Sequence, residues 1–387
     1  MNLILNFFHY LYGTKPQVMP NSSSIYLHIP FCKRLCGYCD FPKTMALGRK
    51  GEVLAAMGEE VVRRSAELEG TVLKTIYFGG GTPSVCEPEE LGALLEKIAT
   101  AVDCTAVEEI TVEANPDDLT EEYLRGLRRV GVSRLSIGIQ SFRNEDLRMM
   151  NRRHDAAGAV RSVESARRAG FDNISIDLIY GLPTLTLEQW EENVQKAIEL
   201  NVEHISAYCL TIEENTLFGK RGVQVAAEEV VEQEYAAMCR LLHEASYEHY
   251  EISNFARPGR RSRHNGAYWR GTPYLGIGPG AHSYDGGHLR SWNSPTIGAY
   301  LAGTAAESEV LSEEELYEEY VMVRLRTCEG VSLNEIATKF GTAKAEEFAH
   351  RAQRFIHDGV LLQRGTNIAF AEGAWLVSDG VTAEFFD

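Results

Sequence analysis

Three cysteines that lie close together constrain this chain more than any other feature of its sequence. Cys32, Cys36 and Cys39 are separated by three and then two residues, and they directly follow an apolar run, residues 25–29, that has the composition of a β-strand. So short a loop can place three thiolates on three irons of a cubic [4Fe–4S] cluster. No fourth cysteine follows at ligand spacing, so the fourth iron of such a cluster would stay open to another ligand.

A zinc site whose fourth ligand is not visible in the sequence, or a chance grouping, is the alternative. Structural zinc sites usually combine two closely spaced pairs of ligands, and no second pair of cysteines occurs here. The remaining cysteines are scattered along the chain, and each is expected to be a small, buried, apolar side chain: Cys86, Cys104, Cys209, Cys239 and Cys328. We therefore favour the cluster.

The composition is that of a soluble globular protein, with 44% hydrophobic and 24% charged residues among 387. The net charge of −17 argues against nucleic acid or an anionic membrane as the main partner. Sparse, unpaired cysteines indicate a reducing compartment rather than a disulfide framework.

The first residues form a separate segment. The apolar stretch 3–12 is too short to span a bilayer, and it lacks the basic leader and small-residue cleavage site of a signal peptide. We therefore expect a cytoplasmic protein with an N-terminal extension over residues 1–24 and at most peripheral contact with a membrane.

Strand-like and helix-like segments alternate over residues 25–300. Six apolar strands, ending near residues 29, 78, 113, 138, 177 and 208, are each followed by a helical pattern. Helices end at Gly131, Gly170 and Asn201, residues that tolerate the left-handed backbone of a helix C-terminus. Repeated strand–helix units predict parallel strands with right-handed crossovers. The sequence therefore predicts an α/β fold, an incomplete six-stranded (βα)6 TIM-like barrel.

A smaller α+β domain is predicted over residues 301–387. Ser312 and Ser332 each precede a helical pattern as N-cap residues, and residues 360–371 read as a hairpin that turns at 364–367. Three helices and a hairpin resemble a winged helix. Such folds often bind DNA, but the acidic charge gives no electrostatic reason to expect that here.

Several motifs found for separate reasons fall at the same end of the predicted barrel. Active sites of βα barrels lie at the C-terminal ends of the strands. Cys32, the glycine-rich turn 79–82, Glu113, Gln140 and Asp177 all follow or end a predicted strand. We therefore expect one site that contains all of them.

The cysteine motif, set between residues 28–31 and 38–41, resembles that of the radical S-adenosylmethionine (SAM) superfamily. Nearly the whole chain resembles the branch that contains oxygen-independent coproporphyrinogen III oxidase and the HemW group of haem chaperones. The resemblance implies that Cys32, Cys36 and Cys39 hold a [4Fe–4S] cluster and that SAM binds its open iron.

The same resemblance implies which residues contact SAM. Tyr26 and Gly80 match contacts of the cluster-bound SAM, Tyr38 lies near its adenine, and Glu113 matches an acidic position that suits the ribose hydroxyls. For Glu113, a solvated carboxylate at a strand end is the alternative.

A second group matches positions that surround a second SAM in the oxidase: Gly81, Thr82, Gln140, Arg152 and Asp177. For Arg152 and Asp177, a structural ion pair is an equal alternative.

Three features separate the chain from the oxidase and favour the haem chaperones. The oxidase motif has another cysteine two residues beyond the third cluster ligand, whereas in this chain Asp40 and Phe41 occupy that segment. The oxidase also has a longer N-terminal arm. The segment His264-Asn-x-x-Tyr268-Trp269 matches a HemW-type signature. A neutral imidazole can be an axial haem ligand, with the two aromatic rings stacked on the macrocycle. A buried hydrogen-bonding histidine is the alternative, and His282 is a second candidate ligand.

We therefore expect a haem chaperone that holds a [4Fe–4S] cluster, SAM and haem. Its expected partners are haem, apo-haem proteins (respiratory enzymes among the candidates) and an electron donor for the cluster. The alternative is a radical SAM enzyme that oxidatively decarboxylates two propionates of coproporphyrinogen III in porphyrin biosynthesis. The sequence leaves open whether SAM is cleaved, and thus whether the protein is an enzyme.

Overall fold

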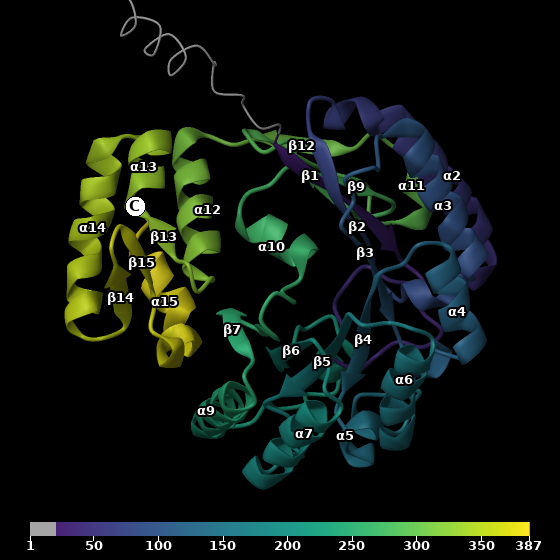
Figure 1. Ribbon diagram of the computed structural model, residues 1–387, viewed down its shortest axis with the longest axis horizontal. Coiled ribbons are helices and arrows are strands. Elements are labelled where there is room, and N and C mark those ends of the chain that lie inside the picture. Colours follow the sequence, from purple (N-terminus) through teal and green to yellow (C-terminus); the bar gives the residue numbers. More distant parts are fainter. Residues whose placement is uncertain (1–20, 387) are drawn as a thin grey trace, which may run out of the picture.

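The computed structural model describes residues 21–386 and has six parallel strands at its centre (Figure 1). They lie side by side in chain order, which confirms the predicted partial barrel. They are β1 (Ser22–Ile29), β2 (Val72–Gly80), β3 (Glu109–Ala114), β4 (Arg134–Gln140), β5 (Ile174–Tyr180) and β6 (His204–Cys209). β1 therefore begins within the segment expected as an extension, and the apolar stretch 3–12 lies outside the described residues.

Helices cover the outer face of this curved sheet (Figure 1). They are α2 (Lys50–Arg64), α3 (Pro88–Ala101), α4 (Glu121–Arg129), α5 (Asn144–Met149), α6 (Ala156–Arg168) and α7 (Leu187–Glu199). Their apolar residues recur at helical spacing, so that α3 buries Leu91, Leu94 and Ile98 against the strands. The predicted helix ends are confirmed, because Gly131, Gly170 and Asn201 all have positive φ.

Short strands extend the sheet at both edges, and the sequence did not predict them. β9 (Tyr274–Ile277) pairs parallel to β1, and β10 (His282–Tyr284), β11 (Leu289–Trp292) and β12 (Glu307–Val310) continue the sheet antiparallel. At the other edge, β8 (Asn254–Ala256) and β7 (Glu248–Glu251) follow β6. The main sheet therefore reaches Val310, beyond the boundary expected at residue 300, and its added strands cover edges of β1 and β6 that would otherwise be unpaired.

The C-terminal domain has the predicted helices and hairpin. It contains α12 (Glu313–Leu325), α13 (Leu333–Phe340), α14 (Thr342–His357), α15 (Ser378–Ala383), the short helix η5 (Glu372–Val377), and strands β13 (Val331–Ser332), β14 (Leu361–Arg364) and β15 (Asn367–Phe370). Ser312 accepts a hydrogen bond from the backbone N–H of Glu315, and Ser332 from that of Glu335, which confirms both N-caps.

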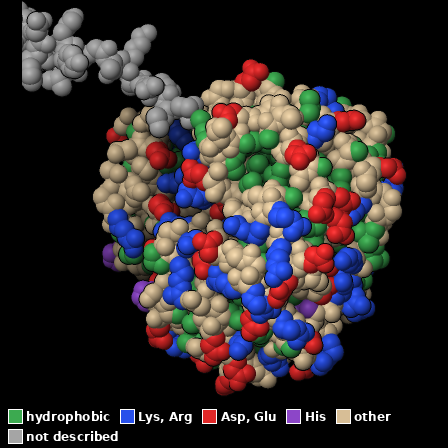
Figure 2. Space-filling view, turned by 45° about the vertical axis from the view of Figure 1, so that its right-hand side comes forward, with side chains coloured by type: hydrophobic (Ala, Val, Ile, Leu, Met, Phe, Trp, Pro, Cys, Tyr) green, Lys and Arg blue, Asp and Glu red, His purple; other side chains and the backbone are tan. Residues whose placement is uncertain are grey.

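Four further helices lie in the segment between β6 and α12. They are α8 (Leu217–Lys220), α9 (Glu228–Glu244), α10 (Arg263–Trp269) and α11 (Ile297–Leu301). No helix in the described part of the chain has both the length and the apolar character that a membrane span requires. On the face shown in Figure 2, acidic and basic side chains are interspersed, and apolar side chains gather around a hollow.

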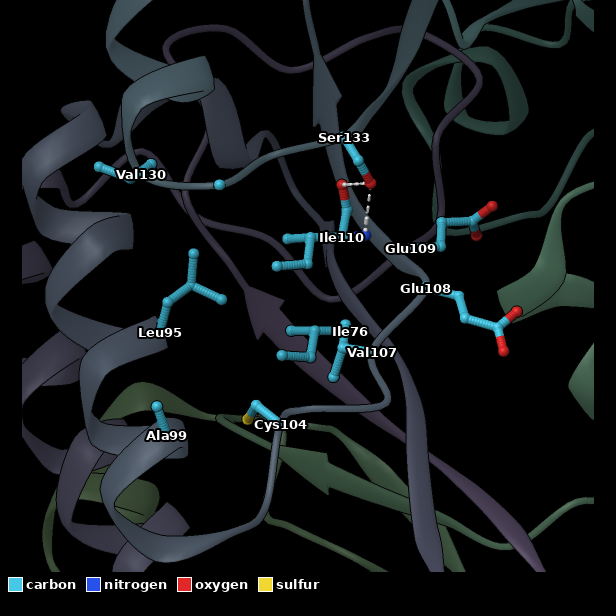
Figure 3. Close-up of a pocket in the computed structure, with 11 residues that line it drawn as sticks. Ile76, Leu95, Ala99, Cys104, Val107, Glu108, Glu109, Ile110, Val130 and Ser133 are labelled. Carbon is cyan, nitrogen blue, oxygen red and sulfur yellow. Dashed lines mark hydrogen bonds between the residues drawn. The ribbon is translucent and has the colours of Figure 1, made fainter.

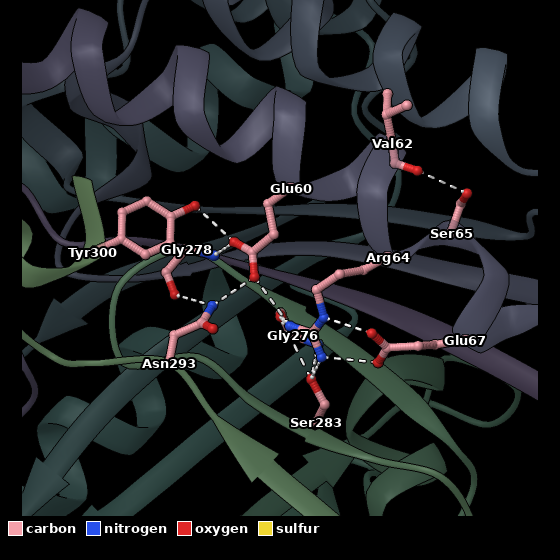
Figure 4. A network of polar contacts seen from close by, with 10 residues as sticks. All are labelled: Glu60, Val62, Arg64, Ser65, Glu67, Gly276, Gly278, Ser283, Asn293 and Tyr300. Atoms are coloured by element: carbon pink, nitrogen blue, oxygen red, sulfur yellow. Dashed lines mark hydrogen bonds and ion pairs between the residues drawn. The ribbon is translucent and has the colours of Figure 1, made fainter. Parts of the chain in front are cut away.

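A buried carboxylate joins α2 to the added strands (Figure 4). Glu60 is 1% exposed, and its oxygens accept hydrogen bonds from Arg64 (3.0 Å), the backbone N–H of Gly278 (3.0 Å), Asn293 (2.7 Å) and Tyr300 (2.6 Å). A charge taken out of water is stable only when it is paired and fully hydrogen-bonded, as this one is.

We predict that Glu60→Ala lowers the free energy of unfolding by about 3–5 kcal/mol, because it leaves the Gly278 N–H and the Tyr300 hydroxyl without their acceptor and removes one of the two carboxylates that pair with Arg64. The matched control is Glu52→Ala on the same helix, which removes an exposed carboxylate that pairs with Arg49, the residue directly before α2, and should cost at most about 1 kcal/mol. Urea denaturation followed by circular dichroism measures both. Equal effects of the two substitutions would contradict this account of the network.

Candidate functional site

The loop that carries the three cysteines leaves the C-terminal end of β1 and is held in place by two other segments. The backbone N–H of Gly37 donates to the carbonyl of Met150 at 3.0 Å, and its carbonyl accepts from the N–H of Phe218 at 2.9 Å. A Cβ on Gly37 would come within 2.3 Å of the Phe218 ring, and the Tyr38 ring lies 6.5 Å from that ring. The loop 32–39 is therefore clamped between the end of α5 and α8.

Two of the three cysteine sulfurs receive hydrogen bonds from residues outside the loop, one that follows β2 and one that follows α5. The Thr82 hydroxyl donates to Cys32 Sγ at 3.3 Å, and the Arg152 guanidinium donates to Cys36 Sγ at 3.2 Å. Burial raises the pKa of Cys32 to about 11, and the Thr82 hydrogen bond opposes this. Hydroxyl and guanidinium donors stabilise negative charge on sulfur, and hydrogen bonds of this kind are common around iron–sulfur clusters. Three cysteines on one loop with such donors fit a cluster held by three thiolates.

The glycine turn after β2 is pressed against the end of β1. Gly80 has φ +107°, and a Cβ there would come within 2.6 Å of the His28 ring. A Cβ on Gly81 would come within 2.8 Å of the backbone of Pro30, and the Gly81 N–H donates to the carbonyl of Ile29 at 2.8 Å. Glycine is therefore required here by packing within the protein, before any cofactor is considered.

Glu113 at the end of β3 is bound to this turn. Its carboxylate accepts a hydrogen bond from the Tyr77 hydroxyl at 2.8 Å and from the backbone N–H of Gly80 at 3.2 Å. Burial raises the pKa of Glu113 to about 7, and the charge of Asp177 contributes. The Tyr26 ring stacks on that of Tyr77, with centroids 6.1 Å apart. Glu113 is thus a partly buried, fixed carboxylate rather than a freely solvated one.

Arg152 reaches across the strand ends. Besides Cys36, its guanidinium donates to the Asn115 side-chain oxygen at 2.6 Å and to the Gly138 carbonyl at 2.5 Å. Asn115 also donates to the Thr82 hydroxyl at 3.5 Å. Asn115 is a site residue that was not predicted from the sequence, although its place directly after β3 was a usable signal.

Asp177 lies on β5 and Gln140 is the last residue of β4, the neighbouring strand. Asp177 accepts a hydrogen bond from the Ser136 hydroxyl at 3.4 Å, and burial raises its pKa to about 6. No ion pair between Asp177 and Arg152 is present among the described residues, so the structural alternative for that pair does not hold in this conformation. Gln140 is buried, and its φ of +71° accompanies an irregularity in the pairing of β4 with β5.

His264 lies on α10, buried against the inner face of β2. It is 1% exposed, its Nδ1 is 2.8 Å from the Thr75 hydroxyl, and its Nε2 is 3.0 Å from the Tyr268 hydroxyl. Its ring stacks on Tyr77 with centroids 4.8 Å apart. Burial lowers the pKa of His264 to about 3, so the imidazole is neutral. Both ring nitrogens are hydrogen-bonded, so ligation of a metal by His264 requires one partner to move away.

The start of α10 is fixed to β3. The carboxylate of Glu109, a buried residue at the first position of β3, accepts hydrogen bonds from the backbone N–H groups of Arg263 (3.2 Å) and His264 (3.1 Å). His282, the second candidate ligand, is by contrast exposed on β10, where its ring stacks on Trp292 at 5.7 Å.

A separate cavity of about 310 Å³ lies at the opposite end of the strands, between β2, β3 and the helices α3 and α4. Its lining is mainly apolar, and the side chains of Glu108 and Glu109 point away from it (Figure 3). The candidate site therefore does not coincide with this cavity.

Comparison with known proteins places these features in a family. The Radical SAM superfamily matches residues 26–197, and the HemN C-terminal domain matches residues 311–377. Among solved structures, coproporphyrinogen III oxidase (HemN) from Escherichia coli has a similar fold, with a TM-score of 0.83 and 24% identity over 96% of this chain and 91% of that one.

Curated relatives are more similar in sequence. The heme chaperone HemW of Lactococcus lactis is 36% identical over 95% of this chain and 97% of its own length. The heme chaperone HemW of Bacillus subtilis is 38% identical over 82% of this chain and 87% of its own length. The chain belongs to the HemW family of the radical SAM superfamily.

Proposed function

We propose that this protein is a haem chaperone that holds a [4Fe–4S] cluster through Cys32, Cys36 and Cys39, binds SAM beside it, and transfers haem to apo-haem proteins. The observation that carries the proposal is the pair of donors, Thr82 and Arg152, whose hydrogen bonds end on the sulfurs of Cys32 and Cys36. The relatives named heme chaperones support haem as the cargo.

The strand ends provide the groups that a bound SAM needs. In this proposal Glu113 accepts hydrogen bonds from the ribose while Gly80 holds the carboxylate in position. Tyr26, which stacks on Tyr77, and Tyr38 are the proposed aromatic contacts of SAM. The cluster, when bound, would supply an electron-transfer centre with an open iron for the amino and carboxylate groups of SAM. An electron donor that reduces it is accordingly a proposed partner.

The residues around Arg152 form the outer part of the proposed site. Arg152 fixes one cluster sulfur and, through Asn115, the Thr82 hydroxyl. Asp177 and Gln140 lie on the adjoining strands, and Gly81 keeps the turn close to β1. These residues would orient SAM and separate the cluster from water.

For haem, we propose His264 as the axial ligand, under one structural condition. Its Nε2 becomes available only if the Tyr268 hydroxyl, 3.0 Å away, moves off it. A neutral imidazole, as burial enforces here, is the ligating form. The exposed His282 is the alternative ligand.

The cluster proposal predicts that Cys36→Ala abolishes the cluster, because each cysteine is the protein ligand of one iron. Anaerobically reconstituted wild-type protein should contain about four irons per chain, and the variant should lose nearly all of them together with the visible absorbance. Cys104→Ala, at a part-buried cysteine outside the loop, is the control and should keep full iron content. Full retention of the cluster in Cys36→Ala would refute the ligand assignment.

The SAM proposal predicts a pH-dependent affinity. Because the pKa of Glu113 is about 7, its carboxylate is mostly protonated below that pH, and SAM should bind about tenfold more weakly at pH 6 than at pH 8. Glu113→Gln should bind weakly at both pH values while keeping its iron. Isothermal titration calorimetry on cluster-loaded protein measures this.

The control for the SAM prediction is Glu122→Gln, at an exposed glutamate on α4, which should retain the wild-type affinity and pH profile. Asp177 also has a raised pKa, to about 6, and its charge helps to raise the pKa of Glu113, so Asp177→Asn should keep the pH dependence but move it to a lower pH. An unaltered pH profile in Glu113→Gln would remove Glu113 from the SAM site.

The haem proposal predicts opposite effects of two neighbouring substitutions. His264→Ala should weaken haem binding at least about tenfold and alter the haem absorption spectrum, since it removes the proposed ligand. Tyr268→Phe should keep or strengthen binding, because it frees Nε2 without removing the ring. If only His282→Ala changes the spectrum, the ligand is His282.

The same preparation separates a chaperone from an oxidase. With cluster, SAM and a reductant present, we expect no conversion of coproporphyrinogen III, measured by chromatography of the porphyrin products. Accumulation of protoporphyrinogen IX over many turnovers would show that the protein is the oxidase and not a chaperone.

A further inference from the structure

Three metal-ligating side chains meet where the C-terminal domain contacts the barrel. Cys239 lies on α9, His249 on β7 and Glu372 at the start of η5. His249 Nδ1 is 3.9 Å from Cys239 Sγ and 3.4 Å from a carboxylate oxygen of Glu372. The three ligand atoms all lie within 4.8 Å of one another. Residues from three separate elements thus bring a sulfur, a nitrogen and an oxygen close together.

The His249 ring is held in one orientation by its neighbours. Its side chain is 3% exposed, it stacks on Phe255 with centroids 3.9 Å apart, and it meets the edge of Trp375 at 4.1 Å. The Tyr235 hydroxyl donates to the backbone carbonyl of Glu372 at 3.4 Å and so fixes the first residue of η5. The geometry therefore does not depend on a freely rotating surface histidine.

The spacing of these atoms suits a small tetrahedral ion. Zinc binds sulfur at about 2.3 Å and nitrogen or oxygen at about 2.0–2.2 Å, which at tetrahedral angles separates neighbouring ligand atoms by about 3.3–3.6 Å. The distances of 3.4 and 3.9 Å from His249 Nδ1 are close to this. A thiolate, an imidazole and a carboxylate favour zinc over calcium or magnesium, which take oxygen ligands.

Solvent can reach one side of the group. The Glu372 side chain is 51% exposed, which leaves a path for an ion to enter and a position for water as the fourth ligand. An ion pair between a protonated His249 and Glu372 would account for those two residues alone. The Cys239 thiol lies within hydrogen-bond distance of the same nitrogen, so a metal-free site would share Nδ1 between two partners, and zinc titration decides between the two arrangements.

We propose that Cys239, His249 and Glu372 bind one Zn²⁺ ion, separate from the cluster, that fastens the C-terminal domain to the barrel. Two ligands belong to the barrel segment and one to the C-terminal domain, so the ion would link the two directly. The proposal does not depend on the haem or SAM proposals, because none of its residues belongs to that site.

The test uses the full-length, cluster-loaded protein, so that the cluster cysteines are occupied by iron. Zinc is titrated in competition with a chromophoric chelator, and iron is measured at each point to show that zinc does not displace it. We expect one zinc per chain, bound at least about tenfold more weakly in Cys239→Ser and in Glu372→Gln. Cys104→Ser is the matched control and should bind zinc as the wild type does.

A second measurement identifies the sulfur ligand. Co²⁺ added in place of zinc should give a thiolate-to-cobalt charge-transfer band in the difference spectrum against the cobalt-free, cluster-loaded protein, and Cys239→Ser should lose it. Zinc should also raise the midpoint temperature of unfolding of the wild type but not that of Glu372→Gln. Because the Glu372 side chain is half exposed, this substitution is expected to leave the fold intact. Equal zinc affinity in wild type, Cys239→Ser and Glu372→Gln, or no charge-transfer band in the wild type, would overturn the proposal.

Discussion

The pairing of β1 with β2 decides where the rest of the site lies. Ile29 is opposite Gly80 in the parallel register, and the Gly81 N–H continues the contact to the Ile29 carbonyl. The cysteine loop and the glycine turn therefore leave the sheet at adjacent points. A shift of one residue would turn every side chain of β1 to the opposite face, and Tyr26 and His28 would no longer line the site. The hydrogen bond from Thr82 to Cys32 depends on this single register.

The barrel could be predicted because its signals are local. Apolar strands, amphipathic helices and left-handed helix ends such as Gly131 and Asn201 are visible in the residues themselves. Strands β9 to β12 could not be predicted, because they are short and form only by pairing with neighbouring strands. Gly276 is an example: a Cβ there would lie 1.9 Å from the His282 carbonyl oxygen, a requirement that only the folded hairpin creates.

The candidate site was predictable as a set of positions but not as a set of contacts. Strand ends indicated Cys32, Glu113 and Asp177, since parallel strands end at one edge. Nothing in the sequence indicated that Arg152 donates to Cys36 rather than pairing with Asp177, because hydrogen-bond direction depends on side-chain orientation. For His264, the buried and hydrogen-bonded state that the sequence offered as the alternative is the one observed, but its cause, packing against Thr75 and Tyr77, lies far away in the chain.

Strand β3 holds two parts of the molecule at a fixed separation. Glu109 at its beginning holds the first turn of α10, and Glu113 near its end holds the glycine turn. The two side chains share a face of the strand, and four residues of extended chain separate them by about 13 Å. An opening of α10 that exposes His264 must therefore either detach the helix from Glu109 or carry β3 with it. Only detachment of the helix from Glu109 leaves Glu113 in place. The hydrogen bonds of the Glu109 carboxylate therefore determine whether α10 can move independently of β3.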